Sequence, residues 1–299
     1  MTIQTTSLRV AIAIATAGRR HAVAETIGLL ATQSRMADEL LICPAKEVDF
    51  NPLCLESYPG KARVFYGPTG LPHQRNVLLD ATDADIVIFF DDDFLPSDDY
   101  VAEVEALFAT HPKVVVSTGK LLADGALGPG IAHSAGLHIL DQAGSNNGSP
   151  SMKTTYNGYG CNMSIRMKTV RQHGVRFDER LPLYAWLEDV DFSRQLSSYG
   201  DIVQASRLRG VHLGVKGAGR SSGLRLGYSQ VANPIYLARK GTMHWPLALK
   251  HISKNLVANT LRSLYPEPWV DRRGRLMGNM KAFLDLFLGK MIPEKAVKI

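Results

Sequence analysis

Three acidic residues follow directly on an apolar segment near the middle of the first half of the chain. Residues 86–90 are Ile-Val-Ile-Phe-Phe, and Asp91, Asp92 and Asp93 come next. An uninterrupted apolar run of this kind predicts a strand buried on both faces, as in a parallel sheet, and open α/β sheets bind ligands at the carboxyl ends of such strands. Because side chains alternate along an extended chain, Asp91 and Asp93 can face one divalent cation while Asp92 points elsewhere.

A simpler interpretation is an acidic loop in front of a helix. Ser97 would then be the N-cap, and Asp98 and Asp99 would lie in the positive first turn of the helix. This accounts for Asp98 and Asp99 but not for three carboxylates joined to a buried strand. We therefore favour a metal site at Asp91 and Asp93.

A second acidic cluster contains Glu188, Asp189 and Asp191. Acids in the first turn of a helix are favoured by its dipole whatever their function. These acids, however, lie in an otherwise basic half of the chain, where a general base beside a metal–diphosphate site would have this character. His212, at the end of another predicted strand, is a candidate third metal ligand, although a lone histidine is more often a core or edge residue.

The elements that must position these residues alternate between strand and helix. We predict strands at 8–16, 39–43, 63–66, 86–90 and 114–118, with helices at 21–34, 74–81 and 97–109 between them. This order indicates an α/β fold with a mostly parallel sheet and flanking helices. The Gly-, Ser- and Asn-rich segment 121–150 is predicted to be a mobile loop, a β-excursion over the site or a plain connection. A strand at 161–165, a helix at 188–198 and a strand at 208–213 follow.

We expect the chain to divide into an α/β domain over 1–215, which carries both acidic clusters, and a helical, basic extension over 216–299. A linker at 217–223 precedes predicted helices at 224–240, 247–265 and 278–291. The last helix has an apolar face that we expect to pack on the main domain or a partner subunit, or to lie on a membrane surface.

The net charge of +6 hides an asymmetry between the two halves of the chain. Residues 1–150 hold 10 Lys and Arg against 18 Asp and Glu (−8), and residues 151–299 hold 24 against 10 (+14). A basic tail favours phosphate-bearing partners: a nucleotide, an anionic lipid or a nucleic acid. We see no aromatic platform among the basic residues, so we expect no nucleic acid.

Three cysteines with no paired spacing indicate a reducing compartment. No signal peptide and no membrane-spanning run is visible. These features predict a cytoplasmic protein, peripheral at most at the inner face of a membrane, and they leave its oligomeric state open.

Taken in chain order, these motifs resemble those of the family 2 glycosyltransferases, which have the GT-A fold. The resemblance covers about 8–215. It rests on the first strand with its loop through Arg19, the Gly70…Arg75-Asn76 stretch, Asp91-Asp92-Asp93 as the DxD motif, Glu188-Asp189-Val190-Asp191 as the ED motif, and His212.

The resemblance implies an inverting, metal-dependent transfer of a sugar from a nucleoside-diphosphate donor to a hydroxyl acceptor. Asp93, with Asp91 and His212, would hold Mg²⁺ or Mn²⁺. Asp189 would take the proton of the acceptor, with Glu188 as the second candidate. The donor would contact Thr16, Ala17, Arg19, Arg75, Asn76, Asp91 and Asp92. The basic tail favours a saccharide or lipid-linked acceptor, as in bacterial-type polysaccharide or glycolipid assembly.

One departure from the family pattern leaves the nucleotide open. Relatives often have an Asp after the second strand that contacts the base, whereas residues 42–45 here are Ile-Cys-Pro-Ala, so UDP, GDP and dTDP all remain candidates. Two alternative functions also remain. A metal-dependent nucleotidyltransferase would favour a more Gly-rich phosphate loop than the one around Gly18, and a non-catalytic GT-A-fold binding protein would not need the intact acids.

Overall fold

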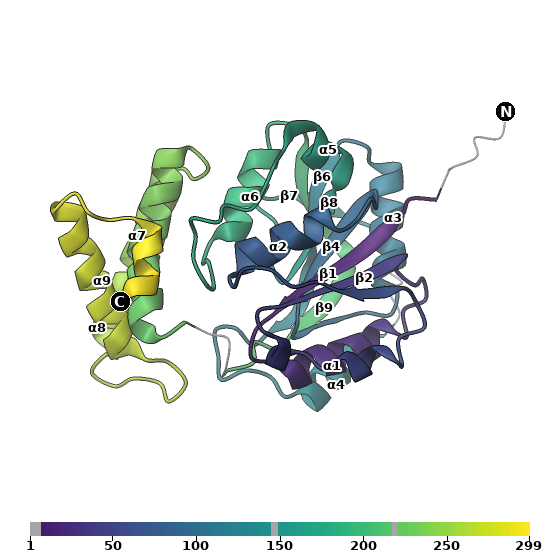
Figure 1. The fold of residues 1–299 in the computed structure, drawn as a ribbon, viewed down its shortest axis with the longest axis horizontal. Helices are drawn as coiled ribbons and strands as arrows, with labels where there is room; N and C mark the ends of the chain where they lie inside the picture. The colour runs from purple at the N-terminus through teal and green to yellow at the C-terminus, as the bar shows by residue number, and fades with distance from the viewer. Residues whose placement is uncertain (1–6, 145–148, 217–220) are drawn as a thin grey trace.

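The computed structural model describes residues 7–144, 149–216 and 221–299 (Figure 1). The strands are β1 (Val10–Thr16), β2 (Glu39–Pro44), β3 (Ala62–Val64), β4 (Ile86–Asp91), β5 (Phe94–Pro96), β6 (Val114–Asp124), β7 (Met152–Thr154), β8 (Asn162–Arg166) and β9 (Asp201–His212). The α-helices are α1 (Arg20–Leu30), α2 (Leu71–Asp80), α3 (Tyr100–Thr110), α4 (His133–Ala143), α5 (Met167–His173), α6 (Glu188–Leu196), α7 (Gly223–Lys240), α8 (Trp245–Arg262) and α9 (Arg272–Phe287). Short 3₁₀ turns are η1 (Glu47–Asp49), η2 (Pro52–Leu55) and η3 (Pro293–Lys298).

All the strands of the described residues belong to one sheet. Its order is β3-β2-β1-β4-β8-β6-β9-β5, with β7 paired to β9 outside this path. The strands β3, β2, β1 and β4 are parallel, and β8 runs antiparallel to both β4 and β6. The α/β class and the parallel arrangement predicted for the first half of the chain are therefore confirmed.

Helices cover both faces of the sheet, and this explains the continuous apolar strands. Val10, Ile12 and Ile14 of β1 pack in a core with α1 and α3, whereas Ala11 and Ala13 pack in a core with α2, α5 and α6. A strand buried on both faces leaves no position for a polar side chain until it reaches the edge of the sheet. In β4 that edge is Asp91.

The structure corrects the prediction for residues 121–150. This segment contains the end of β6 and helix α4. Gly136 of α4 faces Leu95 and Leu213, whose side chains would lie 2.8 and 2.6 Å from a Cβ at this position. The glycine that weakens the helical pattern in the sequence is thus the residue that lets α4 pack closely on β5 and β9.

Other helices begin elsewhere than predicted. Helix α2 begins at Leu71 rather than at 74. Helix α3 begins at Tyr100 with Asp99 in the N-cap position, and the Ser97 hydroxyl donates a hydrogen bond to the Asp99 carboxylate at 2.6 Å instead of capping the helix. Helix α9 begins at Arg272 rather than at 278, because Asp271 accepts a hydrogen bond from the Gly274 amide at 2.8 Å. Of the predicted linker 217–223, residues 217–220 lie outside the described residues.

The C-terminal helices form a bundle beside the sheet (Figure 1). Helices α7 and α9 cross closely, since a Cβ on Gly278 would lie 2.1 Å from the Leu224 carbonyl oxygen. Buried amides connect the three helices: Asn259 Nδ2 of α8 donates to Gln230 Oε1 of α7 and to Asn279 Oδ1 of α9, each at 2.9 Å. No helix among the described residues is long and apolar enough to span a membrane.

The bundle is attached to the segment around α6. Leu181, Leu187 and Val190 pack against residues of α7 and α8, and Lys240 at the end of α7 forms ion pairs with Asp178 and Asp191. The helical extension therefore contacts the element that carries the second acidic cluster.

Candidate active site

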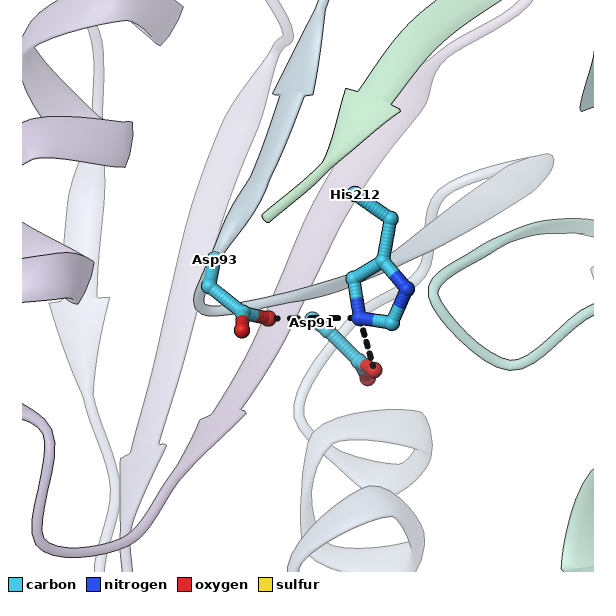
Figure 2. Close-up of side chains that lie close together, drawn as sticks. All are labelled: Asp91, Asp93 and His212. Atoms are coloured by element: carbon cyan, nitrogen blue, oxygen red, sulfur yellow. Dashed lines mark ion pairs between the residues drawn. The ribbon is translucent and has the colours of Figure 1, made fainter. Parts of the chain in front are cut away.

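Three side chains suited to bind a cation meet at the carboxyl end of β4. Asp91 ends β4, Asp93 lies in the turn before β5, and His212 ends β9. The register of β5 with β9 places Phe94 opposite His212, and this brings the imidazole beside Asp93. His212 Nε2 lies 3.5 Å from Asp93 Oδ1 and 3.8 Å from Asp91 Oδ2 (Figure 2). One possible ligand atom from each residue lies within 4.8 Å of the others.

A further carboxylate, Asp124, orients the imidazole ring. The pairing of β6 with β9 places Asp124 opposite His212, and Asp124 Oδ1 lies 2.9 Å from His212 Nδ1. Burial alone would lower the pKa of His212, but the carboxylates of Asp124 and Asp93 raise it to about 10. Because Asp124 contacts Nδ1, the other ring nitrogen, Nε2, faces Asp91 and Asp93. Metal sites often have this arrangement, in which a carboxylate holds the nitrogen of a histidine ligand that does not bind the metal. No sequence pattern singles out Asp124.

Arg19 and Thr16 hold Asp92, and Arg19 also holds Asp93. Arg19 lies 2.7 Å from Asp92 Oδ1 and 3.1 Å from Asp93 Oδ2, and the Thr16 hydroxyl donates to Asp92 at 2.6 Å. Burial raises the pKa of Asp92 to about 7. Burial would also raise the pKa of Asp93, but His212 and Arg19 lower it to about 2. The fully buried Asp92 thus holds the loop after β1.

The second acidic cluster lies on the other side of Asp91. Arg75 is buried and donates to Glu188 Oε1 at 2.7 Å, to Asp91 Oδ1 at 3.2 Å and to the Gly160 carbonyl at 2.8 Å. The Gly160 amide donates to Asp189 Oδ2 at 3.0 Å. A Cβ on Gly160 would lie 3.2 Å from Glu188 Oε1 and 3.4 Å from Arg75 Nη1, so any larger residue would crowd these two side chains.

Glu188 and Asp189 have different surroundings although they are adjacent. Glu188 is buried against Arg75, whereas Asp189 is partly exposed. Burial raises the pKa of Glu188 to about 8, and it raises the pKa of Asp189 as well. Burial is the largest cause of both shifts, and the single buried guanidinium of Arg75, which faces Glu188, Asp189 and Asp91, opposes them in part.

Two other residues singled out in the sequence have partners outside this cluster. Asn76 donates to the Phe177 carbonyl and accepts from the Phe177 amide, each at 3.0 Å, so it holds the segment after α5. Asp191 accepts hydrogen bonds from Lys240 at 2.8 Å and Thr242 at 2.6 Å, and these bonds join α6 to the C-terminal bundle.

We call Asp91, Asp93 and His212 the cation cluster. A cavity of about 420 Å³ adjoins this cluster, and Asp91 belongs to both. Four of the residues expected to contact a donor line it: Thr16, Ala17, Arg19 and Asp91. Arg75, Asn76 and Asp92 are not among its lining residues. The cavity is also lined by residues that no sequence pattern singles out, among them Lys46, Asp49, Gln74, Tyr184, Ser222 and Arg225.

Residues 11–173, more than half of the chain, match the family model of glycosyl transferase family 2. The chain belongs to this family. As a family 2 glycosyltransferase it is an enzyme that transfers sugars. The matched segment contains Asp91 and Asp93 but ends before Glu188, Asp189 and His212. None of the curated proteins compared with this family 2 glycosyltransferase matches it.

Solved glycosyltransferases share the fold of this family 2 glycosyltransferase. S. aureus TarS 1–349 matches with a TM-score of 0.58 and 14% identity, over 97% of this chain and 82% of that chain. The same fragment of TarS in complex with UDP-GlcNAc gives 0.55 and 13%, over 93% and 81%. The mannosyltransferase PcManGT from Pyrobaculum calidifontis, in complex with GDP-Man and Mn²⁺, gives 0.54 and 14%, over 98% and 86%. The predicted GT-A-type fold is confirmed.

Proposed function

We propose that this protein transfers a sugar from a nucleoside-diphosphate donor to an acceptor hydroxyl with inversion, and that the reaction depends on a divalent cation. The main support is that the cluster of Asp91, Asp93 and His212 adjoins a cavity lined by Thr16 and Arg19. The neighbours with UDP-GlcNAc, and with GDP-Man and Mn²⁺, agree with a donor of this class.

The residues of the cluster fit a bound cation. Asp93 Oδ1 is buried, and no described residue donates a well-aligned hydrogen bond to it, although His212 Nε2 lies 3.5 Å away. Two carboxylates and an imidazole suit Mg²⁺ or Mn²⁺. A cation held there by Asp91, Asp93 and His212 would offset the negative charge that develops on the departing diphosphate.

Asp189 is the proposed general base. Its two oxygens accept hydrogen bonds from the amides of Gly160 at 3.0 Å and Val190 at 2.8 Å, so the carboxylate is fixed in orientation. Partial exposure lets an acceptor hydroxyl reach it, and its raised pKa makes it a stronger base than a free aspartate. Glu188 remains the second candidate, although its carboxylate is buried against Arg75. One base and one leaving group are sufficient for a single displacement with inversion.

The cavity offers contacts for each part of a nucleoside diphosphate. Arg19 and Lys46 carry positive charge suited to the phosphates, and the carboxylate of Asp49 can accept the ring N–H of a base. Uracil, thymine and guanine have such an N–H and cytosine has none, so we propose UDP, dTDP or GDP as the donor nucleotide. We propose a saccharide or a lipid-linked saccharide as the acceptor. The basic C-terminal half of the chain favours the lipid-linked form, because positive charge attracts phosphate-bearing lipids.

Thermal unfolding with UDP, GDP, dTDP and CMP, each with and without Mn²⁺, tests the proposal. A ligand at 100 times its Kd stabilises the native state by about 2.7 kcal/mol. We expect one nucleoside diphosphate to raise the Tm only with Mn²⁺, and Asp93→Asn to abolish the shift. The exposed Asp98→Asn is the matched control and should retain it.

The product then tests the chemistry. NMR of the product formed from an α-linked donor should show a β-linkage. A shift that persists in EDTA would contradict metal dependence, retention of configuration would contradict the single displacement, and no shift with any nucleotide would contradict the donor class.

A further inference from the structure

Two helices of the C-terminal bundle leave large apolar side chains exposed. These are Leu249, Val257 and Leu261 of α8 and Met280, Leu284 and Phe287 of α9. Helices α8 and α9 lie side by side in the bundle (Figure 1). We call these six side chains the α8–α9 surface. Exposed apolar groups gathered in this way mark an interaction site more often than isolated ones do.

The bundle does not need this surface for its own stability. Met280, Leu284 and Phe287 follow the i, i+4, i+7 spacing of one helical face. The other face of α9 buries Gly278 and Ala282 against the bundle, with Gly278 in close contact with α7. Phe287 is 89% exposed, so its ring takes almost no part in the core. Helix α9 therefore has a second apolar face in addition to the one that packs inside the bundle.

The chain segment that carries this surface is basic. Residues 241–299 contain 10 Lys and Arg against 4 Asp and Glu. Three of these four acids are already neutralised: Glu267 by Arg262 and Arg272, Asp285 by Lys295, and Glu294 by Arg180. The fourth, Asp271, accepts the hydrogen bond that caps α9.

Three lysines of these helices or just after them, in contrast, have no acidic partner among the described residues. Lys250 and Lys254 of α8 and Lys290 after α9 are exposed, and none of them forms an ion pair with a described residue. A partner that meets the surface must therefore be apolar in its interior and negatively charged at its edge.

We propose that the α8–α9 surface binds the face of an anionic lipid bilayer. A bilayer offers acyl chains for the apolar side chains and negative headgroups for the lysines, the combination that amphipathic helices recognise. Tyr265 and Trp269, exposed in the loop between α8 and α9, are of the residue types that concentrate at headgroup level. A second copy of the chain fits less well, because a symmetric contact through this surface would bring lysines against lysines.

Sedimentation of the full chain with lipid vesicles tests the proposal. The vesicles contain phosphatidylcholine alone or phosphatidylcholine with phosphatidylglycerol, at low and at high salt. The variant Leu284→Glu/Phe287→Glu places two negative charges on the surface. The matched control is Leu127→Glu, which changes an exposed leucine of the sheet domain in the same way. Thermal unfolding checks that both variants fold, and light scattering reports their oligomeric state.

We expect the wild type and Leu127→Glu to bind vesicles with phosphatidylglycerol, and salt to weaken the binding. The double variant should lose about tenfold or more in partitioning, the effect of about 1.4 kcal/mol or more. Lack of binding at low salt would overturn the proposal, and so would equal binding to both vesicle types. A dimer that Leu284→Glu/Phe287→Glu dissociates would assign the surface to a second copy instead.

Discussion

Removal of one charged group at the end of α7 should destabilise helix α6. Lys240 Nζ lies 2.8 Å from Asp191 Oδ2 and 2.6 Å from Asp178 Oδ2. The Asp191 side chain is completely buried and would keep only neutral donors, Thr242 at 2.6 Å and Gln195 at 2.9 Å. Asp178 is less buried and keeps a hydrogen bond from Tyr236 at 2.7 Å. The change Lys240→Met would therefore leave one buried carboxylate without a cation among its described neighbours.

The magnitude follows from the burial of the pair. Loss of one partner of a fully buried ion pair costs about 3–5 kcal/mol. Lys240 is 27% exposed, so water reaches the ammonium. We therefore expect a loss of about 2–3 kcal/mol in the free energy of unfolding, because partial solvation reduces the cost below that of a fully buried pair. At about 2–4 °C per kcal/mol for a large domain, the Tm should fall by about 4–10 °C.

Thermal unfolding at several pH values measures this loss and tests its cause. Burial already raises the pKa of Asp191, and loss of Lys240 should raise it further. The cost arises from the ionised carboxylate, so the difference in Tm should narrow as the pH falls and Asp191 becomes protonated. Lys250→Met, at an exposed lysine with no ion pair among the described residues, should leave the Tm unchanged.

The same substitution in the Asp191→Asn variant tests whether Asp191 causes the loss of stability. In Asp191→Asn the buried group is neutral, so Lys240→Met should cost less than half as much there as in the wild type. An equal cost in both backgrounds, or a Tm within about 1 °C of the wild type, would refute the assignment of the cost to an unpaired Asp191.

Three further predictions concern the reaction. Asp189→Asn should lower kcat by about 10²–10⁴-fold with nucleotide binding retained, since general bases contribute that much, and full turnover would remove Asp189 from this role. Asp124→Asn should weaken Mn²⁺ by about 10–100-fold in a titration of transfer activity, because His212 loses the carboxylate that orients it, and an unchanged Mn²⁺ dependence would argue against that role. Because the pKa of Asp189 is raised by burial and the base must be ionised, kcat/KM should decline with falling pH at a pH above that of a free aspartate, and a limb at the ordinary aspartate pKa would contradict the base assignment.

Local patterns in the sequence were sufficient to predict the cation cluster and the acidic helix. An apolar strand that ends in Asp91 must place that carboxylate at the sheet edge, because the buried strand offers no other polar position. His212 was identifiable for a similar reason, at the end of β9. The proximity of these residues required only that the strand ends meet at one edge.

The partners that depend on register and on loop path were not predictable in this way. Asp124 contacts His212 across 88 positions of the chain, and the contact depends on the irregular pairing of β6 with β9. Asp49 reaches the cavity only because η1 turns back after β2, so inspection of residues 42–45 could not reveal it. Gly136 illustrates the converse case, since close packing on β5 and β9 overrides its low helix propensity.

The amides buried in the C-terminal bundle determine how the bundle can move. A slip of α8 by one turn along α7 would separate Asn259 from Gln230 and Asn279. The buried amide donor of Asn259 and its two acceptors would then lose their hydrogen bonds, at about 1–3 kcal/mol for each unsatisfied group. The helices are therefore expected to shift as one body rather than slide past each other. Since the end of α7 is bonded to Asp191, a tilt of the whole body would also move the first turn of α6, where Asp189 lies. Mechanical force applied to the outer helices would in this way reach the carboxylate of Asp189.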